Sequence, residues 1–391
     1  MNIMLFTTGT VINTAGGAEK IFFEMANNFA KSHNVCAVAF DDTKGKPFWK
    51  INNNVKFYNI GLGNSYSNIY INFRTFYIIK KDKRHLKRFE IISKQIAKYL
   101  LPLINKEKPD IIICYDRLAN FVIKEKISVD IPVITMFHSS PDAYLAGSGE
   151  NLINKALEKC ECIQVLMPDF INIYKKYVKT SLNQKIVYIP NPVEIFNLDN
   201  YKKEKVIVNI GRVSRDTKRQ HLLILAFAAI QKEFPDWQIK IYGDYSIDKQ
   251  YYAELQKIII DNKLIDKVKF CGLTHDIEGA LKEAAIFAFP SSHEGFGLAV
   301  AEAMGCGVPS IAYKSCTGVN QLIKDGENGY LVEDGVEPFA YALKELMQNK
   351  SKREKFGLNA QKDIQIYNPD LIWDKWENLI KEICKNTKND C

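Results

Sequence analysis

The chain has 391 residues, of which 47% are hydrophobic and 25% are charged. These proportions are those of an ordinary soluble protein, and the length suggests two domains, each with a hydrophobic core of its own. Nine cysteines are scattered, and the close pair Cys160 and Cys162 fits neither a zinc knuckle nor a thioredoxin motif, which favours reduced thiols. The N-terminus lacks the basic flank of a signal peptide, and no apolar run approaches the roughly 18 residues that span a bilayer. We therefore expect a cytoplasmic protein that can touch a membrane, as a peripheral protein on the inner face of the plasma membrane would, but does not cross it.

The net charge of +8 is unevenly distributed. Residues 1–195 carry nine more basic than acidic side chains, whereas residues 196–391 carry one fewer. A positive first half attracts anionic lipid headgroups, nucleic acid or phosphorylated acceptors. The alternative is a solvated lysine-rich surface, since 45 of the 53 basic residues are lysine, and usage so poor in arginine gives nucleic acid no special support.

Short apolar runs alternate with amphipathic stretches along the first half, which is the pattern of a parallel sheet flanked by helices. Residues 17–32 predict a helix because their apolar side chains recur at the helical period. The predicted strands are Asn2–Thr8, Val35–Phe40, Asp110–Cys114, Val133–Phe137, Ile163–Leu166 and Ile186–Ile189.

The alternation breaks at Pro190-Asn191-Pro192 and in the polar run 199–205, where we place a domain linker. It then restarts. The predicted strands of the second half are Val206–Ile210, Gln238–Tyr242, Lys267–Cys271, Ile286–Phe289 and Val308–Ala312. Its predicted helices cover residues 220–232, 251–262, 276–283, 298–304, 338–348 and 369–384.

These elements predict an α/β chain with two Rossmann-like doubly wound domains that face each other across a cleft. The domains comprise residues 1–195 and 196–368, and residues 369–391 form a C-terminal helix that packs back towards the first domain. Doubly wound sheets bind ligands at the carboxyl ends of their strands, so the loops after the strands should carry the chemistry.

Two glycines, Gly16 and Gly17, lie between the first strand and the first helix. They let the backbone approach a ligand closely, and the free amides of a helix start favour an anion. The pattern differs from the dinucleotide-binding G-x-G-x-x-G sequence, and an ordinary strand-to-helix turn stays an open alternative.

Two cations, Arg212 and Lys218, follow the strand that ends at Ile210. Fixed cations at this edge of a sheet can hold a diphosphate and neutralise the charge that develops on it. The alternative is surface salt bridging, since Arg215 and Arg219 lie beside them.

Two carboxylates, Glu294 and Glu302, lie in the stretch 290–304, in which a strand end, a loop with glycines and a helix follow one another. The helix opens near Gly297 and its first amides form a cradle for an anion. Glu302, about one turn into the helix, can accept two hydrogen bonds from a ribose diol, and Glu294 can hold sugar hydroxyls. The alternatives are a solvated helix face for Glu302 and a helix-start carboxylate for Glu294.

The chain resembles the family 4 retaining glycosyltransferases, which have the GT-B fold. The resemblance is carried by two acidic residues with seven others between them in Glu-Gly-Phe-Gly-Leu…Glu-Ala-Met, by Gly16-Gly17-Ala18-Glu19 and by Gly211-Arg212…Lys218. Tyr242-Gly243-Asp244, Phe270-Cys271-Gly272 and residues 325–332 also fall in the family's order, and the match is strongest over residues 205–335. The spacing from Arg212 to Lys218 is one residue longer than the commonest family pattern, and a second glycine after Gly243 is missing.

The resemblance implies a role for each matching residue. It implies that residues 1–195 form the acceptor domain and residues 196–368 the donor domain. Glu294 and His138 lie near the reacting sugar, although the residues alone favour a core or loop histidine for His138. The remaining implied contacts are Arg212 and Lys218 with the diphosphate, Glu302 with the ribose, Gly16 and Gly17 over the phosphates, and Gly243 and the backbone of Phe296, Gly297 and Leu298 with the donor.

The sequence shows no cluster of metal ligands, because Asp41-Asp42 lacks a third ligand nearby. We therefore expect no metal and no cofactor besides the substrate, with protein cations in the role that a metal has elsewhere. The stretch 74–88 is basic and interleaved with aromatic residues, and predicts either a segment that lies on an anionic membrane or a solvated surface.

The expected function is transfer of a hexose or N-acetylhexosamine from a nucleotide sugar, a UDP-sugar first and GDP-mannose second, with retained anomeric configuration. The expected acceptor is a glycan, free or lipid-linked, in the synthesis of lipopolysaccharide, capsule or another surface polysaccharide. The alternatives are a nucleotide-sugar epimerase or a phosphorylase on the same fold, and a nucleotide-sugar-binding protein without turnover. A nucleic-acid binder is not expected.

Overall fold

The computed structural model describes residues 1–41, 43–61, 81–141, 156–178, 186–197 and 203–389. The chain divides into two compact units. The first comprises Met1–Thr14, Ala18–Pro190 and Trp373–Cys391, and the second comprises Ala15–Gly17 and Asn191–Ile372. Each unit is described by itself below.

The first unit is built on a parallel sheet with the strand order β3-β2-β1-β4-β5-β6-β7. From β1 at the centre the chain proceeds outward first in one direction and then in the other, as in a doubly wound fold. The strands are β1 (Asn2–Thr7), β2 (Asn34–Ala39), β3 (Val55–Asn59), β4 (Ile111–Cys114), β5 (Val133–Met136), β6 (Cys162–Val165) and β7 (Ile186–Tyr188).

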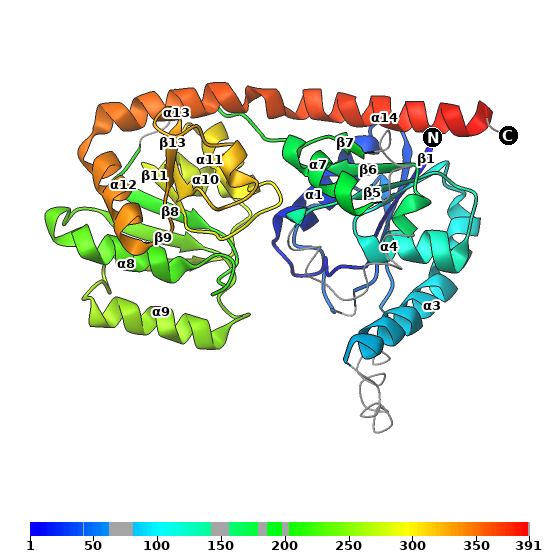
Figure 1. Cartoon of the computed structure of the whole chain (residues 1–391), viewed down its shortest axis with the longest axis horizontal. Coiled ribbons are helices and arrows are strands. Elements are labelled where there is room, and N and C mark those ends of the chain that lie inside the picture. The colour runs from blue at the N-terminus through cyan, green and yellow to red at the C-terminus, as the bar shows by residue number, and fades with distance from the viewer. Residues whose placement is uncertain (42, 62–80, 142–155, 179–185, 198–202, 390–391) are drawn as a thin grey trace. The chain divides into compact units, whose positions relative to one another are not determined.

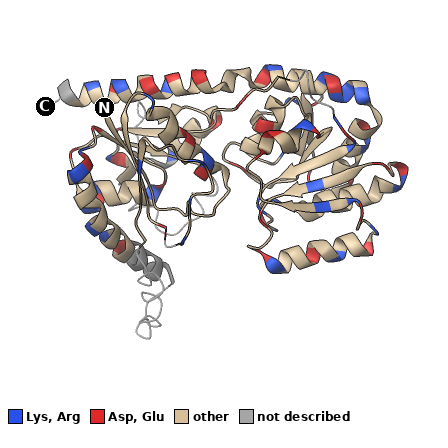
Figure 2. Ribbon diagram, turned by 180° about the vertical axis from the view of Figure 1, so that it is seen from behind, with Lys and Arg blue, Asp and Glu red and all other residues tan. Residues whose placement is uncertain are grey.

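Helices cover this sheet. Residues from Trp373 onward belong to the first unit, where the indole ring of Trp373 packs edge-on against Phe29 with ring centroids 6.2 Å apart. The helices are α1 (Gly17–Phe29), α3 (Lys81–Glu107), α4 (Arg117–Phe121), the π-helical turn η2 (Val122–Ile127), α7 (Pro168–Tyr177) and α14 (Pro369–Asn389). Basic and acidic residues are interspersed along α14 (Figure 2).

The second unit repeats the architecture with the order β10-β9-β8-β11-β12-β13, again all parallel. Figure 1 shows α8 and α9 on one side of this sheet and α11 and α13 on the other. The strands are β8 (Val206–Ile210), β9 (Gln238–Tyr242), β10 (Val268–Gly272), β11 (Ile286–Phe289), β12 (Ser310–Tyr313) and β13 (Gly329–Val332). The helices are α8 (Gln220–Ile230), α9 (Lys249–Asp261), α10 (Ile277–Lys282), α11 (Leu298–Gly305), α12 (Val336–Gln348) and α13 (Lys350–Ile364), with the short 3-10 turns η4 (Gln231–Glu233), η5 (Val319–Gln321) and η6 (Gln365–Tyr367).

Side-chain caps fix where several helices begin. The carboxylates of Asp116, Asp248 and Asp276 each accept a hydrogen bond from the amide three residues further on, at the starts of α4, α9 and α10. Such a cap satisfies one of the amides that a helix leaves unpaired at its N-terminus. The caps therefore locate the helix starts directly after the loops that follow the strands.

The predicted fold class is confirmed: both units are α/β and Rossmann-like. Strands β8, β9 and β11 have the predicted bounds. The prediction of a strand over Val308–Ala312 was two residues early, since β12 is Ser310–Tyr313, and the first helix ends at Phe29 and not at residue 32. The sequence did not predict β3, β13, α3, α7 and α13.

The two missed strands are edge strands of their sheets. An edge strand is covered on fewer sides than a central one, so its sequence need not be a continuous apolar run. Only the first residue of each is buried, Val55 in β3 and Gly329 in β13. In the part of the chain that the structure describes, no helix combines the length and the apolar character required to cross a membrane.

The hydrophobic core of the second unit stabilises the sheet from which the loops of this unit extend. Leu223 in α8 has no exposed surface, whereas Leu358 in α13 is 62% exposed. We expect Leu223→Ala to lower the free energy of unfolding by about 3 kcal/mol, because it leaves a cavity in a packed core. The matched control Leu358→Ala should change it by less than about 0.5 kcal/mol. Urea unfolding followed by tryptophan fluorescence compares the two, and equal effects would contradict this description of the core.

Candidate functional site

The candidate site lies where β8 and β11 run side by side in the second unit. Ile207 pairs with Ile286 and Val208 with Phe287, so the carboxyl ends of the two strands are adjacent. The helices that follow them, α8 and α11, go to opposite faces of the sheet (Figure 1). The two connecting loops therefore part above the strand ends, and such a switch point is where doubly wound sheets bind ligands.

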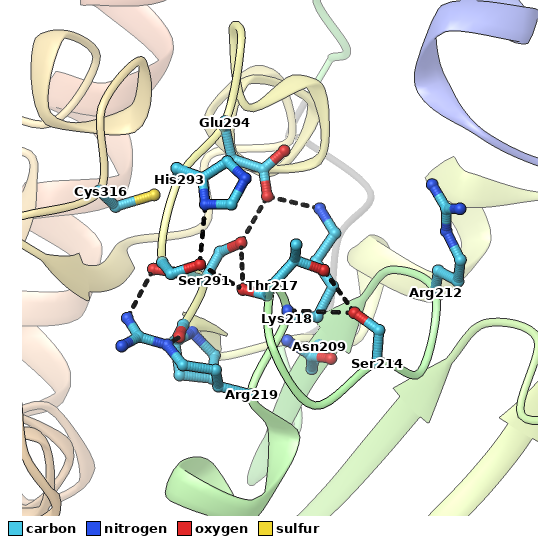
Figure 3. Close-up of polar contacts among 12 residues, drawn as sticks. Asn209, Arg212, Ser214, Thr217, Lys218, Arg219, Ser291, His293, Glu294 and Cys316 are labelled. Atoms are coloured by element: carbon cyan, nitrogen blue, oxygen red, sulfur yellow. Dashed lines mark hydrogen bonds and ion pairs between the residues drawn. The ribbon is translucent and has the colours of Figure 1, made fainter. Parts of the chain in front are cut away.

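An ion pair joins the two loops. Nζ of Lys218 lies 2.5 Å from Oε1 of Glu294, and the two side chains are 19% and 17% exposed. The hydroxyl of Ser291 donates to the same carboxylate oxygen at 2.5 Å. Nζ of Lys218 also lies 4.8 Å from the centroid of the Phe289 ring. The structure thus brings together Lys218 and Glu294, which the sequence had singled out separately, and holds both side chains in place (Figure 3).

Backbone contacts tie the Glu294 loop to its neighbours. The amide of Ser292 donates to the carbonyl of Thr217 at 2.8 Å, and Oγ of Ser291, whose single hydrogen is shared between this carbonyl and Glu294, lies 2.9 Å from it. The amide of Glu294 donates to the carbonyl of Thr317, in the loop after β12, at 3.0 Å. Ser291 and Thr217 were not predicted as site residues, because their roles depend on contacts between loops that are far apart in the sequence.

Helix α11 begins directly after this loop, with Gly297 as its N-cap residue at φ 86°. A Cβ at this position would lie 2.5 Å from Cγ2 of Val319, so both the conformation and the space require glycine. Phe296 is buried and packs edge-on against Tyr367, and Leu298 is the first helical residue. Because a glycine offers no side-chain cap, the first amides of α11 are left for a ligand or water.

Glu302 lies one turn into α11 and is 8% exposed. A carboxylate so nearly buried is rare unless it has polar partners. The alternative of a fully solvated helix face for Glu302 is therefore wrong.

Arg212 and Gly243 mark the ends of β8 and β9. The Arg212 side chain is exposed and lies apart from the Lys218–Glu294 pair (Figure 3). Gly243 has φ 153°, and a Cβ there would lie 2.0 Å from the carbonyl oxygen of Gly211. The close approach of the chain ends after β8 and β9 therefore requires glycine at this position, independently of any contact with a ligand.

The two other arginines of this loop differ in their contacts. Arg215 forms an ion pair with Glu254, so the interpretation as a surface salt bridge holds for this residue. Arg219 instead extends into the loop after β11, as the last Results subsection describes. Among the described residues, no group of three or more His, Cys, Asp or Glu side chains is arranged to hold a metal ion.

In the first unit, His138 follows β5 and its ring stacks on Tyr115, with centroids 4.8 Å apart and an interplanar angle of 18°. Both ring nitrogens are shielded from solvent and have no hydrogen-bond partner among the described residues. Burial lowers the pKa of His138 to about 4, so the ring is neutral near pH 7. Gly16 precedes α1 and Gly17 is its first residue.

Two carboxylates that the sequence did not single out as site residues hold the loop after β1. Asp116 accepts hydrogen bonds from the amide and the hydroxyl of Thr8, both at 2.7 Å. Asp41 accepts from the amides of Val11 and Ile12 at 2.8 and 2.7 Å. Burial raises the pKa of Asp41, but the hydrogen bonds from Thr43, Ile12 and Val11 prevail and lower it. The sequence had assigned Asp41 to an ordinary loop, since a single aspartate after a strand carries no further signal.

The basic segment 74–88 lies partly outside the described residues. Residues 81–88 belong to α3, but nothing is described of their side chains. Its interaction with a membrane stays a prediction.

The two Rossmann-like units, the match to a family model and the likeness to solved structures define the class: the chain is a glycosyltransferase with the GT-B fold. Residues 191–363, less than half of the chain, match the model of the family glycosyl transferases group 1. The resemblance drawn from the motifs is thereby confirmed.

Named relatives match over most of their length. The chain is 26% identical over 367 residues to the poly(ribitol-phosphate) alpha-N-acetylglucosaminyltransferase of Staphylococcus aureus, covering 91% of this chain and 69% of the relative. It is 24% identical over 377 residues to the GalNAc-alpha-(1→4)-GalNAc-alpha-(1→3)-diNAcBac-PP-undecaprenol alpha-1,4-N-acetyl-D-galactosaminyltransferase of Campylobacter jejuni, covering 94% and 96%. The crystal structure of S. aureus TarM in complex with fondaparinux, alpha-GlcNAc-glycerol and UDP has a TM-score of 0.75 at 19% identity and covers 97% and 99%.

The buried histidine predicts a pH dependence of stability. The pKa of His138 lies below its ordinary value of 6.5, so the unfolded chain binds this proton more readily and stability falls as the pH drops below about 6.5. Between about pH 7.5 and pH 5 we expect a loss of about 2 kcal/mol from this residue. His138→Phe, which keeps an aromatic ring against Tyr115, should remove that part of the slope. Urea unfolding of both proteins at the two pH values measures it, and identical slopes would contradict the neutral, buried state.

Proposed function

We propose that this glycosyltransferase moves a hexose or N-acetylhexosamine from a nucleotide diphosphate sugar to a glycan acceptor, with retention and without a metal ion. The donor is a UDP-sugar in the first place and GDP-mannose in the second. The observation that carries the proposal is the Lys218–Glu294 ion pair at the switch point, directly beside the first turn of α11.

The donor diphosphate is held by positive charge from two sources. Arg212 and Lys218 supply side-chain cations at the end of β8, and the amides of Phe296, Gly297 and Leu298 supply donors at the start of α11. Both act where negative charge grows as the bond between sugar and phosphate breaks. Glu302 accepts hydrogen bonds from the ribose hydroxyls in this arrangement.

Glu294 holds the sugar. Its Oε1 is occupied by Lys218 and Ser291, and Oε2 remains to accept hydrogen bonds from sugar hydroxyls. The acceptor hydroxyl attacks the anomeric carbon on the face from which the diphosphate leaves, and its proton goes to an oxygen of the leaving phosphate. One bond between carbon and oxygen breaks and another forms on the same face, which retains the configuration.

The relatives support the direction of this proposal. Both named relatives form alpha linkages, and a transferase that makes an alpha linkage from an alpha-linked nucleotide sugar retains the configuration. Their names give a polyol phosphate polymer and an undecaprenol-linked glycan as acceptors, and TarM was solved with UDP. We therefore infer synthesis of a bacterial surface polysaccharide on a glycan or lipid-linked acceptor, at the cytoplasmic face of the membrane. The roles of His138, Gly16 and Gly17 in this reaction stay predictions.

A panel of nucleotide sugars tests the donor and the site together. The true donor should raise the melting temperature selectively, since a ligand that binds only the folded state stabilises it. Glu294→Gln and Arg212→Ala should each lower kcat/KM by about a hundredfold or more, because each removes a charge facing the reacting groups. The matched controls are Glu333→Gln, at a carboxylate 75% exposed, and Arg215→Ala, on the same loop as Arg212. Near-normal rates in either site variant would remove that residue from the site.

Metal independence has its own test. Because Arg212 and Lys218 take the role of a divalent cation, we expect turnover in excess EDTA to stay within about twofold of the untreated rate. A rate that collapses in EDTA and returns with Mn²⁺ would overturn this part of the proposal, while leaving the donor assignment to the panel above.

A further inference from the structure

Arg219 has an unusual backbone conformation. At φ 48° and ψ 41° it lies in the left-handed region, at the N-cap of α8, and its side chain does not cap the helix. This region suits glycine, and a residue with a long side chain adopts it only when the surrounding contacts hold it there. The contacts of the Arg219 side chain therefore need an explanation.

The guanidinium of Arg219 reaches across to the loop after β11. Its Nε donates to the carbonyl of Pro290 at 2.9 Å, and its Nη2 donates to the carbonyl of Ser291 at 3.0 Å. Its Nη1 forms an ion pair with Oδ1 of Asp334 at 3.0 Å, and its Cζ lies 4.8 Å from the centroid of the Tyr313 ring. Figure 3 shows the side chain directed at the loop that carries Glu294.

A single residue, Ser291, links Arg219 to Glu294, the carboxylate that we assign to the sugar. Ser291 offers its carbonyl to Arg219 and its hydroxyl to Oε1 of Glu294. Lys218, the neighbour of Arg219 in the chain, holds the same oxygen. The guanidinium of Arg219 therefore holds Ser291, and Ser291 in turn holds the Glu294 carboxylate. Because Lys218 directly precedes Arg219 in the chain, the left-handed backbone at Arg219 also fixes the position from which the Lys218 side chain extends.

A direct role in holding the diphosphate fits these contacts less well. The positive charge of Arg219 is paired with Asp334, and its donors are directed at two carbonyls, whereas Arg212 is exposed at the strand end. A planar guanidinium presents its donors on three nitrogens in a rigid fork, which suits two adjacent carbonyls and a carboxylate at fixed positions.

We propose that Arg219 is a positioning residue that acts through Glu294. It locks the loop after β11 so that the Glu294 carboxylate is presented at a fixed place, and Asp334 orients the guanidinium. The inference rests on the proposed function for its effect on turnover, but its structural part does not.

The main test is a double-mutant cycle on sugar transfer. Arg219→Gly suits the left-handed backbone and removes the side chain with its hydrogen bonds, so its melting temperature is measured first and kcat is compared well below it. We expect it to lower kcat about tenfold or more, with a change of less than about threefold in the KM for the donor. In the Glu294→Gln background the same substitution should change kcat by less than about twofold, because its effect passes through that carboxylate. Arg219→Lys should restore little, since a single ammonium nitrogen lacks the rigid fork whose three nitrogens reach Pro290, Ser291 and Asp334.

Equal losses in the two backgrounds, or no loss in the first, would overturn the inference. Arg215→Gly removes the same charge from the same loop and should change kcat by less than about twofold. Hydrogen exchange of the unliganded protein gives a test without turnover: residues 291–297 should exchange about tenfold faster in Arg219→Gly, with β8 and β9 unchanged. Unchanged exchange there would contradict the positioning role, whereas a wild-type protein that transfers no sugar would contradict the proposed function alone.

Discussion

The second unit depends on one topological constraint, the parting of two neighbouring strands. β8 and β11 share a ladder, yet their chains continue to opposite faces of the sheet, so the loops beyond them lose the partners that the ladder provided. Backbone groups in that position must find other partners or be solvated. Side chains supply them here: Ser291 and Arg219 bond to the carbonyls at the parting, and the Lys218–Glu294 pair closes it. The residues of the candidate site are thus also residues that fasten the two loops together.

In the first unit the loops after two neighbouring strands are also joined by a charged side chain, but there it is a carboxylate and not a guanidinium. β1 and β4 are neighbours at its switch point, and Asp116 beyond β4 accepts from the amide and hydroxyl of Thr8 beyond β1. A carboxylate can bond only to donors, so it occupies amides, whereas a guanidinium occupies carbonyls. In the second unit Arg219 engages carbonyls of the loop, and the first amides of α11, which has no side-chain cap, are the groups suited to an anion.

The sequence predicted the fold where burial leaves a clear pattern. β8, β9 and β11 are central strands, β8 and β11 mostly buried and apolar and β9 alternating between buried and more exposed residues, and their predicted bounds are those of the structure. β3 and β13 lie at sheet edges, where no apolar run is required, and they were missed. Lys218 and Glu294 were each identified from their place after a strand, but 76 positions separate them, and only the ladder between β8 and β11 brings them to 2.5 Å. Arg219 was named only in support of the alternative of surface salt bridging, because no local pattern distinguishes an arginine that bonds to distant carbonyls from one in water.

The ion pair at the site is better explained by geometry than by stability. Its side chains keep about a sixth to a fifth of their surface exposed, and pairs with access to water contribute only about 0–1 kcal/mol. The unit has an apolar core around Leu223 and Phe227 that is independent of the pair. Under the proposed function, Lys218 is already occupied by Glu294 before the donor arrives, while Arg212 lies exposed. Arg212 would then act mainly on the bound diphosphate, whereas Lys218 would gain most when the growing charge on the leaving phosphate competes with the carboxylate. An interaction that strengthens as the reaction proceeds lowers the barrier more than one made in full at binding.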